Sequence, residues 1–441
     1  MSKTLIKNVD VITLDAVGAV LRNASIAIDG RTILAVGDPP RDFAPDETIN
    51  GTNHVALPAF FNAHCHAPMT YERGWAEDLP FPRWLNEKIW VAESALTPDD
   101  VYWGAALAAC EMIRGGVAAF NDHYFYMDRV AEVVEQSGLK GGLAWCVFGI
   151  GDDKEIGANL DGTLAFVERW QGRADGRLRL MLGPHSPYIC PPEFLARVAA
   201  IAHERGLTIH LHVAESQEQV DNSLRAHGKT PVAHLAALGV FDGPCVAAHC
   251  LVVGEDDLEI LARHGVHVAH TPITYMKLAM GVNDLSRFFA RGINVAIGTD
   301  GPASNADMDM LAAIRQTVIL QKHEQRNPEA LPGDTALRMA SQNGARAMGV
   351  VDSGAIAPGR AADLALIDMD KPHLLPRHDL VANVVHSAKA ADVTHLIVDG
   401  RLLYRNGELL TLDEDKIKAE AERGAFRMVG SEMRSVREYR G

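Results

Sequence analysis

The chain has 441 residues, of which 47% are hydrophobic and 22% charged, and its formal net charge at pH 7 is -15. This length excludes a single small domain and predicts two or three domains, or one large barrel with attachments. The acidic balance excludes nucleic acid and anionic membranes as partners, because both require basic surface to neutralise phosphate.

The N-terminal segment shows no apolar run of signal-peptide length, and no apolar run in the chain is long enough to span a bilayer, so we expect a cytoplasmic protein. The six cysteines are scattered singly without a Cys-x-x-Cys pair, which is typical of reduced packing residues. Near the N-terminus, "ASIAIDGRTILAVG" predicts two antiparallel strands joined by a tight turn at Asp29-Gly30.

The middle of the chain alternates short apolar runs with amphipathic helical patterns. The runs that we expect to be strands are residues 55–64, 116–122, 141–148, 177–184, 207–213, 244–249, 265–270 and 293–299. Eight such units favour a (β/α)8 TIM-type barrel over an open doubly wound sheet. We expect the barrel to be the catalytic domain, residues 59–354, and the long segment 67–115 to cover its mouth.

The C-terminal stretch "DVTHLIVDGRLLYRNGELL" repeats the tight-turn pattern at Asp399-Gly400 and Asn406-Gly407. Neither end of the chain supplies enough strands for a stable sheet alone. We therefore expect residues 1–58 and 355–441 to form one composite β-sandwich domain beside the barrel.

Polar residues gather where the predicted barrel strands end. His64 and His66, in "LPAFFNAHCHAPM", are two apart and so point to the same face of a strand, whereas Cys65 points to the other. A metal site is one explanation of this pair, and a core histidine beside a surface histidine is the other. Later strand ends carry His185 in "GPHSPY", His210, His212 and Glu215 in "LTIHLHVAES", His249 in "AAHC" and Asp300 in "GTDG". Because the carboxyl ends of barrel strands meet at one rim, this clustering favours the metal site.

The expected metal ligands are His64, His66, His212 and Asp300. Three imidazoles and one carboxylate suit Zn²⁺, with Fe²⁺ as the alternative. Spacing to Glu215 favours His212 over His210, which we interpret as a packing or supporting residue. A second metal would need a bridging lysine or glutamate near the end of the fourth strand, and "RLRLMLGPHSPY" offers neither, so we expect one metal ion per chain.

The stretches "NAHCHAPMTYERGWAEDLPFPRWLNEKIW", "GPHSPYICPPE", "LHVAES", "AAHC" and "GTDGPASN" resemble the amidohydrolase superfamily, and within it the 5-methylthioadenosine/S-adenosylhomocysteine deaminases. The resemblance covers nearly the whole chain and implies the same barrel, the same β-sandwich and the same four metal ligands. It also implies that Glu215 shuttles protons, that His249 positions the hydrolytic water, that Glu93 contacts ribose hydroxyls and that His185 contacts the substrate.

Two departures from the family pattern bear on the substrate. Trp145, in "GLAWCVFG", stands at or near a position where the family often has arginine, so a carboxylate tail on the substrate would lose a partner. After the seventh strand, "HTPITYMKL" with Thr271, Thr274 and Tyr275 replaces a common His-Asn-Pro-x-Ser-Asn pattern.

These patterns predict a zinc-dependent hydrolytic deaminase of a small molecule, a purine nucleoside such as adenosine, 5'-methylthioadenosine or S-adenosylhomocysteine. In the expected reaction Glu215 protonates a ring nitrogen, and Asp300 takes a proton from the water and passes it to the departing ammonia. The alternatives are a deaminase or hydrolase of another aminated heterocycle (guanine-like, pterin or triazine) and a catalytically inactive assembly protein of the same fold. An amidase-type ring hydrolase is disfavoured by the missing fourth-strand bridge. A homo-oligomer is compatible with the sequence.

Overall fold

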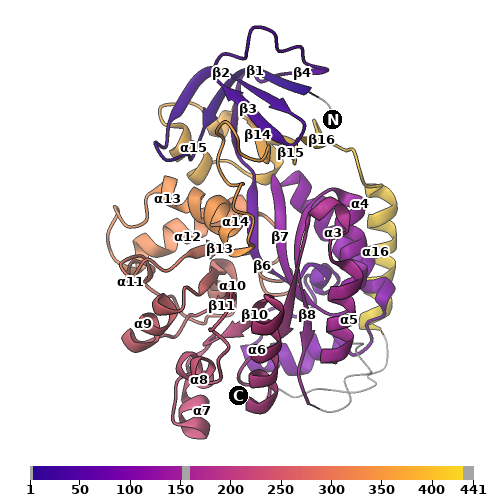
Figure 1. Cartoon of the computed structure of the whole chain (residues 1–441), viewed down its shortest axis with the longest axis vertical. Helices are drawn as coiled ribbons and strands as arrows, with labels where there is room; N and C mark the ends of the chain where they lie inside the picture. Colours follow the sequence, from indigo (N-terminus) through magenta and orange to yellow (C-terminus); the bar gives the residue numbers. More distant parts are fainter. Residues whose placement is uncertain (1–2, 151–158, 431–441) are drawn as a thin grey trace.

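The computed structural model describes residues 3–150 and 159–430. Within these ranges the chain forms an eight-stranded parallel sheet and a separate nine-stranded mixed sheet, which lie at opposite ends of the view in Figure 1. The first is the predicted barrel, and the second is built from strands near both ends of the chain. The predicted fold class is thereby confirmed.

The mixed sheet joins the two ends of the chain through β5 and β14, which pair antiparallel with Leu57 opposite Ala365. Its strands are β1 (Lys3–Ile12), β2 (Val20–Asp29), β3 (Thr32–Val36), β4 (Glu47–Asn50), β5 (His54–Pro58), β14 (Leu364–Asp368), β15 (Val393–Val398), β16 (Arg401–Arg405) and β17 (Glu408–Leu409). All three predicted tight turns connect neighbouring antiparallel strands of this sheet. Both residues of the turns at Asp399 and Asn406 have positive φ, as the favoured two-residue hairpin turns require.

The first predicted barrel strand, residues 55–64, is two strands in the structure. Its first half is β5 of the mixed sheet, and its second half is β6 (Phe60–Cys65) of the barrel. The chain changes sheets at Ala59, whose backbone N–H donates to the carbonyl of Asp363. Both halves are buried, so the sequence shows one continuous apolar run across the junction.

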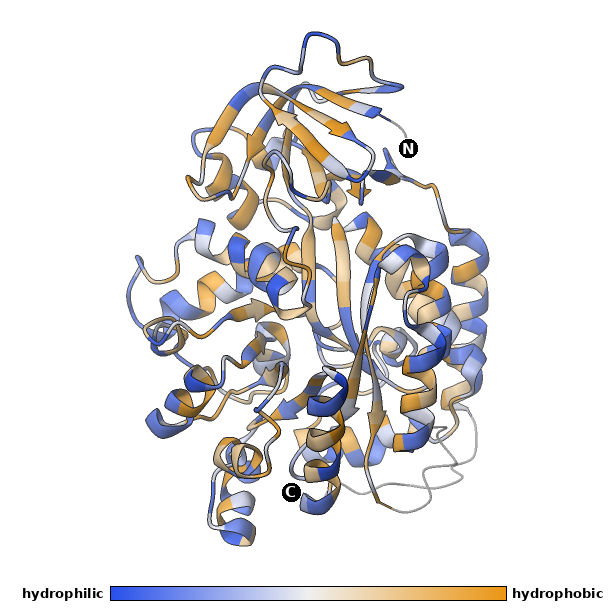
Figure 2. Cartoon of the chain, viewed as in Figure 1, coloured by the Kyte–Doolittle hydropathy of each residue, from blue (hydrophilic) through white to orange (hydrophobic). Residues whose placement is uncertain are grey.

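The barrel strands follow one another in sequence order around the sheet. They are β6, β7 (Val117–Tyr124), β8 (Lys140–Val147), β9 (Leu178–Pro184), β10 (Thr208–Val213), β11 (Cys245–His249), β12 (His267–His270) and β13 (Val295–Ile297). Figure 2 shows these central strands as largely hydrophobic and the surrounding helices as mixed, the pattern of a core covered by amphipathic helices.

The last strand meets the first next to the candidate site. Asp300 donates its backbone N–H to the carbonyl of His64 (2.9 Å), and Thr299 N–H donates to the side chain of Asn62 (2.9 Å). A Cβ atom at Gly298 would come within 2.7 Å of the His64 carbonyl oxygen, so only glycine allows this approach. The closure holds Asp300 beside His64.

Helices cover the outside of the barrel. They include α3 (Pro98–Arg114), α4 (Met127–Ser137), α5 (Leu160–Trp170), α6 (Pro192–Arg205), α7 (Gln217–His227), α8 (Pro231–Ala237), α9 (Glu255–Arg263), α10 (Pro272–Lys277), α11 (Ser286–Phe289), α12 (Met310–Glu324), α13 (Gly333–Arg338) and α14 (Gly344–Ala347). Helix α15 (Leu380–His386) belongs to the C-terminal part, and α16 (Glu414–Val429) packs against α3. Among the residues that the structure describes, no helix is long and apolar enough to cross a membrane.

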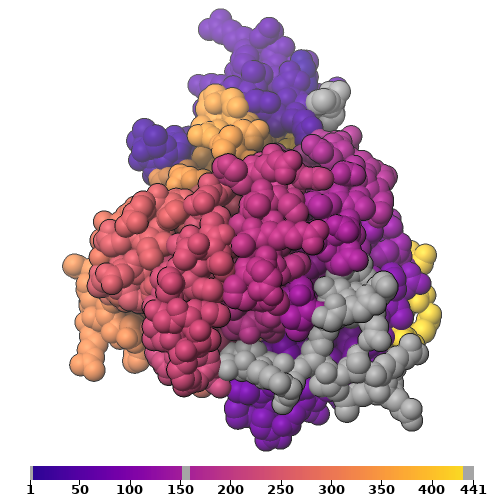
Figure 3. Space-filling model, turned by 60° about the horizontal axis from the view of Figure 1, so that its bottom comes forward, coloured from indigo at the N-terminus to yellow at the C-terminus, as the bar shows by residue number. Residues whose placement is uncertain are grey.

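The segment after β6 forms short helices at the carboxyl ends of the strands. These are η1 (Ala67–Glu72), α1 (Phe81–Trp84), η2 (Leu85–Ile89) and α2 (Trp90–Glu93). Figure 3 turns this end of the molecule toward the viewer, with the mixed sheet behind. Side chains of η1, α1, η2 and α2 line the pocket described below, so this part of the predicted segment 67–115 covers the mouth, whereas its last part forms α3 on the outside of the barrel.

Candidate active site

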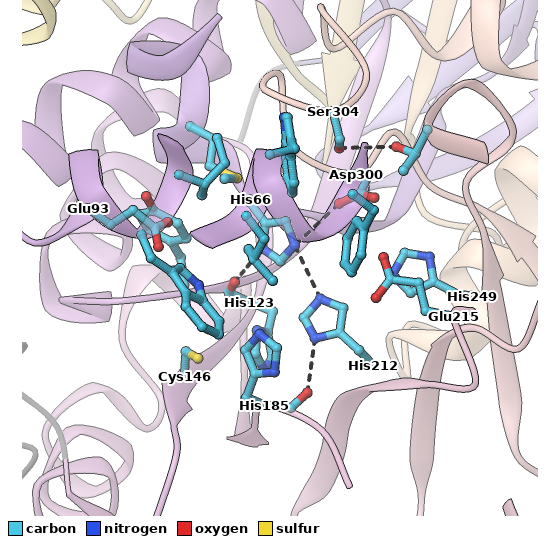
Figure 4. A pocket seen from close by; sticks show the side chains of 18 of the residues that line it. His66, Glu93, His123, Cys146, His185, His212, Glu215, His249, Asp300 and Ser304 are labelled. Atoms are coloured by element: carbon cyan, nitrogen blue, oxygen red, sulfur yellow. Dashed lines mark hydrogen bonds and ion pairs between the residues drawn. The ribbon is translucent and has the colours of Figure 1, made fainter. Parts of the chain in front are cut away.

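The four predicted metal ligands converge at the carboxyl ends of three strands. The distance between the Nε2 atoms of His66 and His212 is 3.3 Å, and Asp300 Oδ1 lies 3.3 Å from His66 Nε2 and 3.6 Å from His64 Nε2. Ligands placed about 2.0–2.1 Å from one tetrahedrally coordinated zinc ion are about 3.3 Å apart. The three distances are therefore close to those between ligands of one zinc ion: His64, His66 and Asp300 form one possible metal-binding group, and His212 adjoins it through His66. Figure 4 shows His66, His212 and Asp300 of this set.

Each histidine of this set is oriented through its other ring nitrogen. The Nδ1 atom of His66 bonds the backbone carbonyl of His123 (2.6 Å), and that of His212 bonds the carbonyl of His185 (2.9 Å). The Nδ1 atom of His64 lies 2.9 Å from Nε2 of His210. The two carbonyl partners fix the tautomers of His66 and His212 with Nε2 free to bind a metal, and the contact with His210 orients the ring of His64. His64 Nε2 is buried and has no hydrogen-bond partner in the described residues, as a metal ligand without its ion would be.

Burial and neighbouring charges shift the pKa values of the predicted ligands, and most of these shifts favour binding of a cation. Burial holds the pKa of His64 well below its usual range and lowers the pKa of His212 to about 4, so both imidazoles carry a free lone pair at neutral pH. Burial alone would raise the pKa of Asp300, but its bonds and charge interactions with His64 and His66 hold it well below the usual range. The same pairing overcomes burial at His66 and raises its pKa to about 9. A buried carboxylate that needs a positive partner fits a metal cation.

Glu215 and His249 stand on one side of the ligand set. Glu215 Oε1 lies 3.6 Å from His249 Nε2, and Tyr188 donates its hydroxyl to Glu215 Oε2 (3.0 Å). Burial raises the pKa of Glu215, which favours a protonated acid. The Nδ1 atom of His249 lies 3.1 Å from Oγ1 of Thr271, so that threonine orients the ring.

The backbone at this rim adopts conformations that side chains other than glycine rarely take. The φ angle is 74° at His249 and 66° at Asp300, and Ala214, next to Glu215, has a φ of 49°. Such strain persists only where surrounding structure holds it, and it concentrates at functional sites.

A pocket opens from these residues. Its polar end carries His66, His212, Glu215, His249 and Asp300, and its wall includes His185. The ring of His185 stacks on Phe148, with ring centroids 5.3 Å apart. The apolar wall includes Phe81, Trp84, Leu85, Ile89, Trp90 and Phe148. The pocket suits a flat heterocycle with an apolar substituent.

Glu93 lies at the end of the pocket away from Glu215 and His249 (Figure 4). It is only 7% exposed and accepts a hydrogen bond from Tyr124. Behind it lies Glu72, which is 1% exposed and has no hydrogen-bond partner for either carboxyl oxygen in the described residues. Burial and the charge of Glu93 hold the pKa of Glu72 well above its usual range.

The structure changes the interpretation of Trp145. Its side chain packs edge-on against Phe166 of α5, with ring centroids 5.4 Å apart, and it is not among the described residues that line the pocket. The next residue, Cys146, does line it, because neighbouring residues of a strand face opposite sides. Trp145 therefore does not stand where a substrate-binding arginine would.

The segment "HTPITYMKL", which also departs from the family pattern, contributes one residue to the pocket wall and another to the packing behind it. Thr274 lines the pocket and donates to Ser304 Oγ (3.1 Å). Tyr275 is fully buried behind His249, with ring centroids 5.9 Å apart, and its hydroxyl accepts from Thr271 N–H.

Sequence reasoning missed several residues of this site: Glu72, His123, Tyr188 and Ser304. Tyr188 and Ser304 stand in the motifs "GPHSPY" and "GTDGPASN", so their nearness to predicted site residues was a usable signal. His123 directly follows the predicted strand 116–122, and Glu72 stands in the stretch "NAHCHAPMTYERGWAEDLPFPRWLNEKIW", so both also carried a usable signal.

Comparison with known proteins agrees with this geometry. The model of the amidohydrolase family matches residues 55–403. A 5-methylthioadenosine/S-adenosylhomocysteine deaminase of Pelotomaculum thermopropionicum is 44% identical over 98% of this chain and 100% of its own length. A 5'-deoxyadenosine deaminase of Methanothermobacter thermautotrophicus is 42% identical over 95% of this chain and 97% of its own.

Among solved structures, an adenosine deaminase from Xanthomonas campestris with bound zinc superposes with a TM-score of 0.91 at 32% identity, covering 96% of this chain and 98% of that one. The chain belongs to the amidohydrolase family. Within that family it is a hydrolytic deaminase, since the relatives named above, which are 32–44% identical over nearly its whole length, are deaminases.

Proposed function

We propose that this enzyme hydrolytically deaminates adenosine-type nucleosides to the inosine-type product and ammonia, and that it prefers uncharged 5' groups. The single observation that carries the substrate class is the position of Glu93, a buried carboxylate at the far end of the pocket from Glu215. A carboxylate there can accept hydrogen bonds from the two ribose hydroxyls while the base reaches Glu215. The relatives named for 5-methylthioadenosine, S-adenosylhomocysteine and 5'-deoxyadenosine support the same class.

We infer that one zinc ion per chain is the cofactor and that His64, His66, His212 and Asp300 hold it, with iron as the alternative. Their spacing supports this assignment, as does His64 Nε2, which has no hydrogen-bond partner among the residues that the structure describes. When bound, zinc would supply Lewis acidity and lower the pKa of a water molecule at the site toward about 7.

The proton transfers follow from the placement of Glu215, Asp300 and His249. As the water oxygen adds to C6 of the base, Glu215 gives its proton to N1 and Asp300 takes a proton from the water. Asp300 then passes that proton to the amino group, which leaves as ammonia, while the added hydroxyl returns a proton to Glu215 and becomes the carbonyl. His249 donates a hydrogen bond to the oxygen throughout. Burial raises the pKa of Glu215, which is the direction that a proton donor to N1 requires.

The preference for an uncharged 5' group rests on the pocket wall. None of the described residues that line the pocket is a lysine or an arginine, and the wall around Glu93 includes Trp90 and Ile89. A methylthio group or a 5'-deoxy carbon can pack against this wall, whereas a zwitterionic amino-acid tail finds no cation among the described residues that line the pocket. S-adenosylhomocysteine is therefore the weaker substrate. A homo-oligomeric state and a cytoplasmic location stay predictions from the sequence.

The experiment compares kcat/KM by ammonia release for adenosine, 5'-methylthioadenosine, 5'-deoxyadenosine and S-adenosylhomocysteine. We expect activity on the first three and a lower value for the fourth. A clear preference for S-adenosylhomocysteine would contradict the preference for an uncharged 5' group but would leave the substrate class intact. Inactivity on all four would contradict the substrate class and favour another aminated heterocycle at the same site.

A further inference from the structure

His123, at the carboxyl end of β7, is a buried imidazole in the pocket to which neither the mechanism nor the ligand set gives a role. It is 1% exposed and lines the pocket. Neither of its ring nitrogens has a hydrogen-bond partner in the described residues. An uncharged imidazole has one N–H donor and one acceptor nitrogen, so both are left for a molecule that enters the pocket.

The surroundings of His123 place it beside the ligand set on the side of the substrate-binding wall. Its ring centroid lies 5.0 Å from that of His212, 6.0 Å from that of His66 and 6.1 Å from that of His185. One ring nitrogen lies within 4.8 Å of ligand atoms of both His66 and His212. A ring nitrogen of His249, in contrast, lies within 4.8 Å of ligand atoms of His64 and His212. His123 and the water-positioning His249 therefore approach the ligand set from different sides.

Free ring nitrogens alone do not mark a binding residue, as His270 on β12 shows. His270 is also fully buried, and its two ring nitrogens also lack partners in the described part of the chain. It packs on Tyr275, with ring centroids 5.3 Å apart, and is not among the residues that line the pocket. What distinguishes His123 is that its free nitrogens belong to a residue of the pocket wall.

We propose that His123 is a substrate-recognition residue that hydrogen-bonds a ring nitrogen of the purine not consumed in deamination, either N3 or N7. The inference rests on the proposed nucleoside substrate. The reacting edge, with N1 and the amino group, is directed at Glu215, His249 and Asp300. The body of the base must then lie along the wall between them and Glu93, where His185 and His123 stand.

Binding of the metal by His123 is the competing role. The four predicted ligands already supply four donors, so the remaining position of the metal is needed for the hydrolytic water, and the Nε2 atoms of His66 and His212 can each bind only one ion. His123 also makes no hydrogen-bond-length contact with either of them. Metal content is therefore measured beside activity.

The test measures kcat/KM for adenosine, 3-deazaadenosine and 7-deazaadenosine with the wild type, His123→Leu, His123→Asn and the matched control His270→Leu. A buried polar group that loses its partner typically costs a factor of about ten or more. In the wild type, we expect one of the two deaza analogues to fall about tenfold or more below adenosine. In His123→Leu that ratio should approach one, and in His123→Asn part of the discrimination should remain.

Each outcome decides the inference. Both His123 variants should keep about one metal per chain, and His270→Leu should keep the wild-type analogue ratios. Loss of metal in His123→Leu would assign the residue to the metal centre and overturn the proposal. Unchanged analogue ratios would overturn it in favour of a packing role. A wild-type enzyme inactive on adenosine would overturn the proposed function as well, and would be recognised before any variant is measured.

Discussion

Glu72 makes the stability of the protein depend on pH in a direction opposite to that of a paired carboxylate. It is buried beside Glu93, and no cation of the described residues offsets its charge. Its pKa is therefore raised above the ordinary value of 4.5, so the folded state keeps a proton that the unfolded chain releases. Stability must then fall as the pH rises above the unfolded pKa, until the folded pKa is reached.

The magnitude follows from proton linkage. Each pH unit in this window costs about 1.4 kcal/mol, or about 3 kcal/mol between pH 4.5 and pH 7 if Glu72 stays protonated in the fold. Glu72→Gln removes the linked proton, while the burial cost of its amide is the same at every pH. The stability of the variant relative to the wild type should therefore increase steadily from about pH 5 to pH 7.

Urea unfolding followed by circular dichroism measures this difference at each pH. Glu204→Gln on the exposed face of α6 is the matched control and should change stability by no more than about 0.5 kcal/mol at any pH. If the stability difference between Glu72→Gln and the wild type does not change over this pH range, Glu72 does not hold a proton in the folded state that the unfolded chain releases.

Three further predictions concern the site. His210→Leu should weaken zinc binding by about ten- to a hundredfold in a chelator competition, because His64 loses the partner that orients it; wild-type affinity would contradict this role. Glu215→Gln should retain metal and lose about a hundredfold or more in kcat, since the amide cannot carry the proton; a variant keeping more than about a tenth of the turnover would exclude the proton shuttle. 2'-Deoxyadenosine should be poorer than adenosine by about 1–3 kcal/mol in kcat/KM, because Glu93 is left partly unpaired; equal values would remove Glu93 from ribose recognition.

The periodic features of the fold could be predicted from the sequence. Tight turns such as Asp399-Gly400 depend on local conformational preference, and the barrel strands depend on short-range apolar patterns, so both were confirmed. The junction at Ala59 could not be found in the same way. Two consecutive buried strands give one apolar run, and only the pairing of β5 with β14 shows that they belong to different sheets.

At the site, residue types at strand ends were sufficient to bring the predicted ligands together, because parallel strands end at one rim. Side-chain direction was harder to predict. Trp145 faces α5 rather than the pocket. Because neighbouring residues of a strand face opposite sides of the sheet, an error of one residue in the expected position exchanges a pocket residue for one that packs against a helix. The interpretations of Glu72 and His123 depend on side-chain atoms without a hydrogen-bond partner in the described part of the chain, which only three-dimensional packing reveals.

The central claim is that the four converging side chains hold one metal ion on which deamination depends. Metal analysis of the purified protein, with ammonia release from adenosine before and after chelation, tests it most directly. We expect about one zinc or iron ion per chain, loss of ammonia release when the metal is removed and its return when the metal is added back, and loss of both metal and activity in His64→Ala. Two ions per chain, or full activity of the metal-free protein, would contradict it.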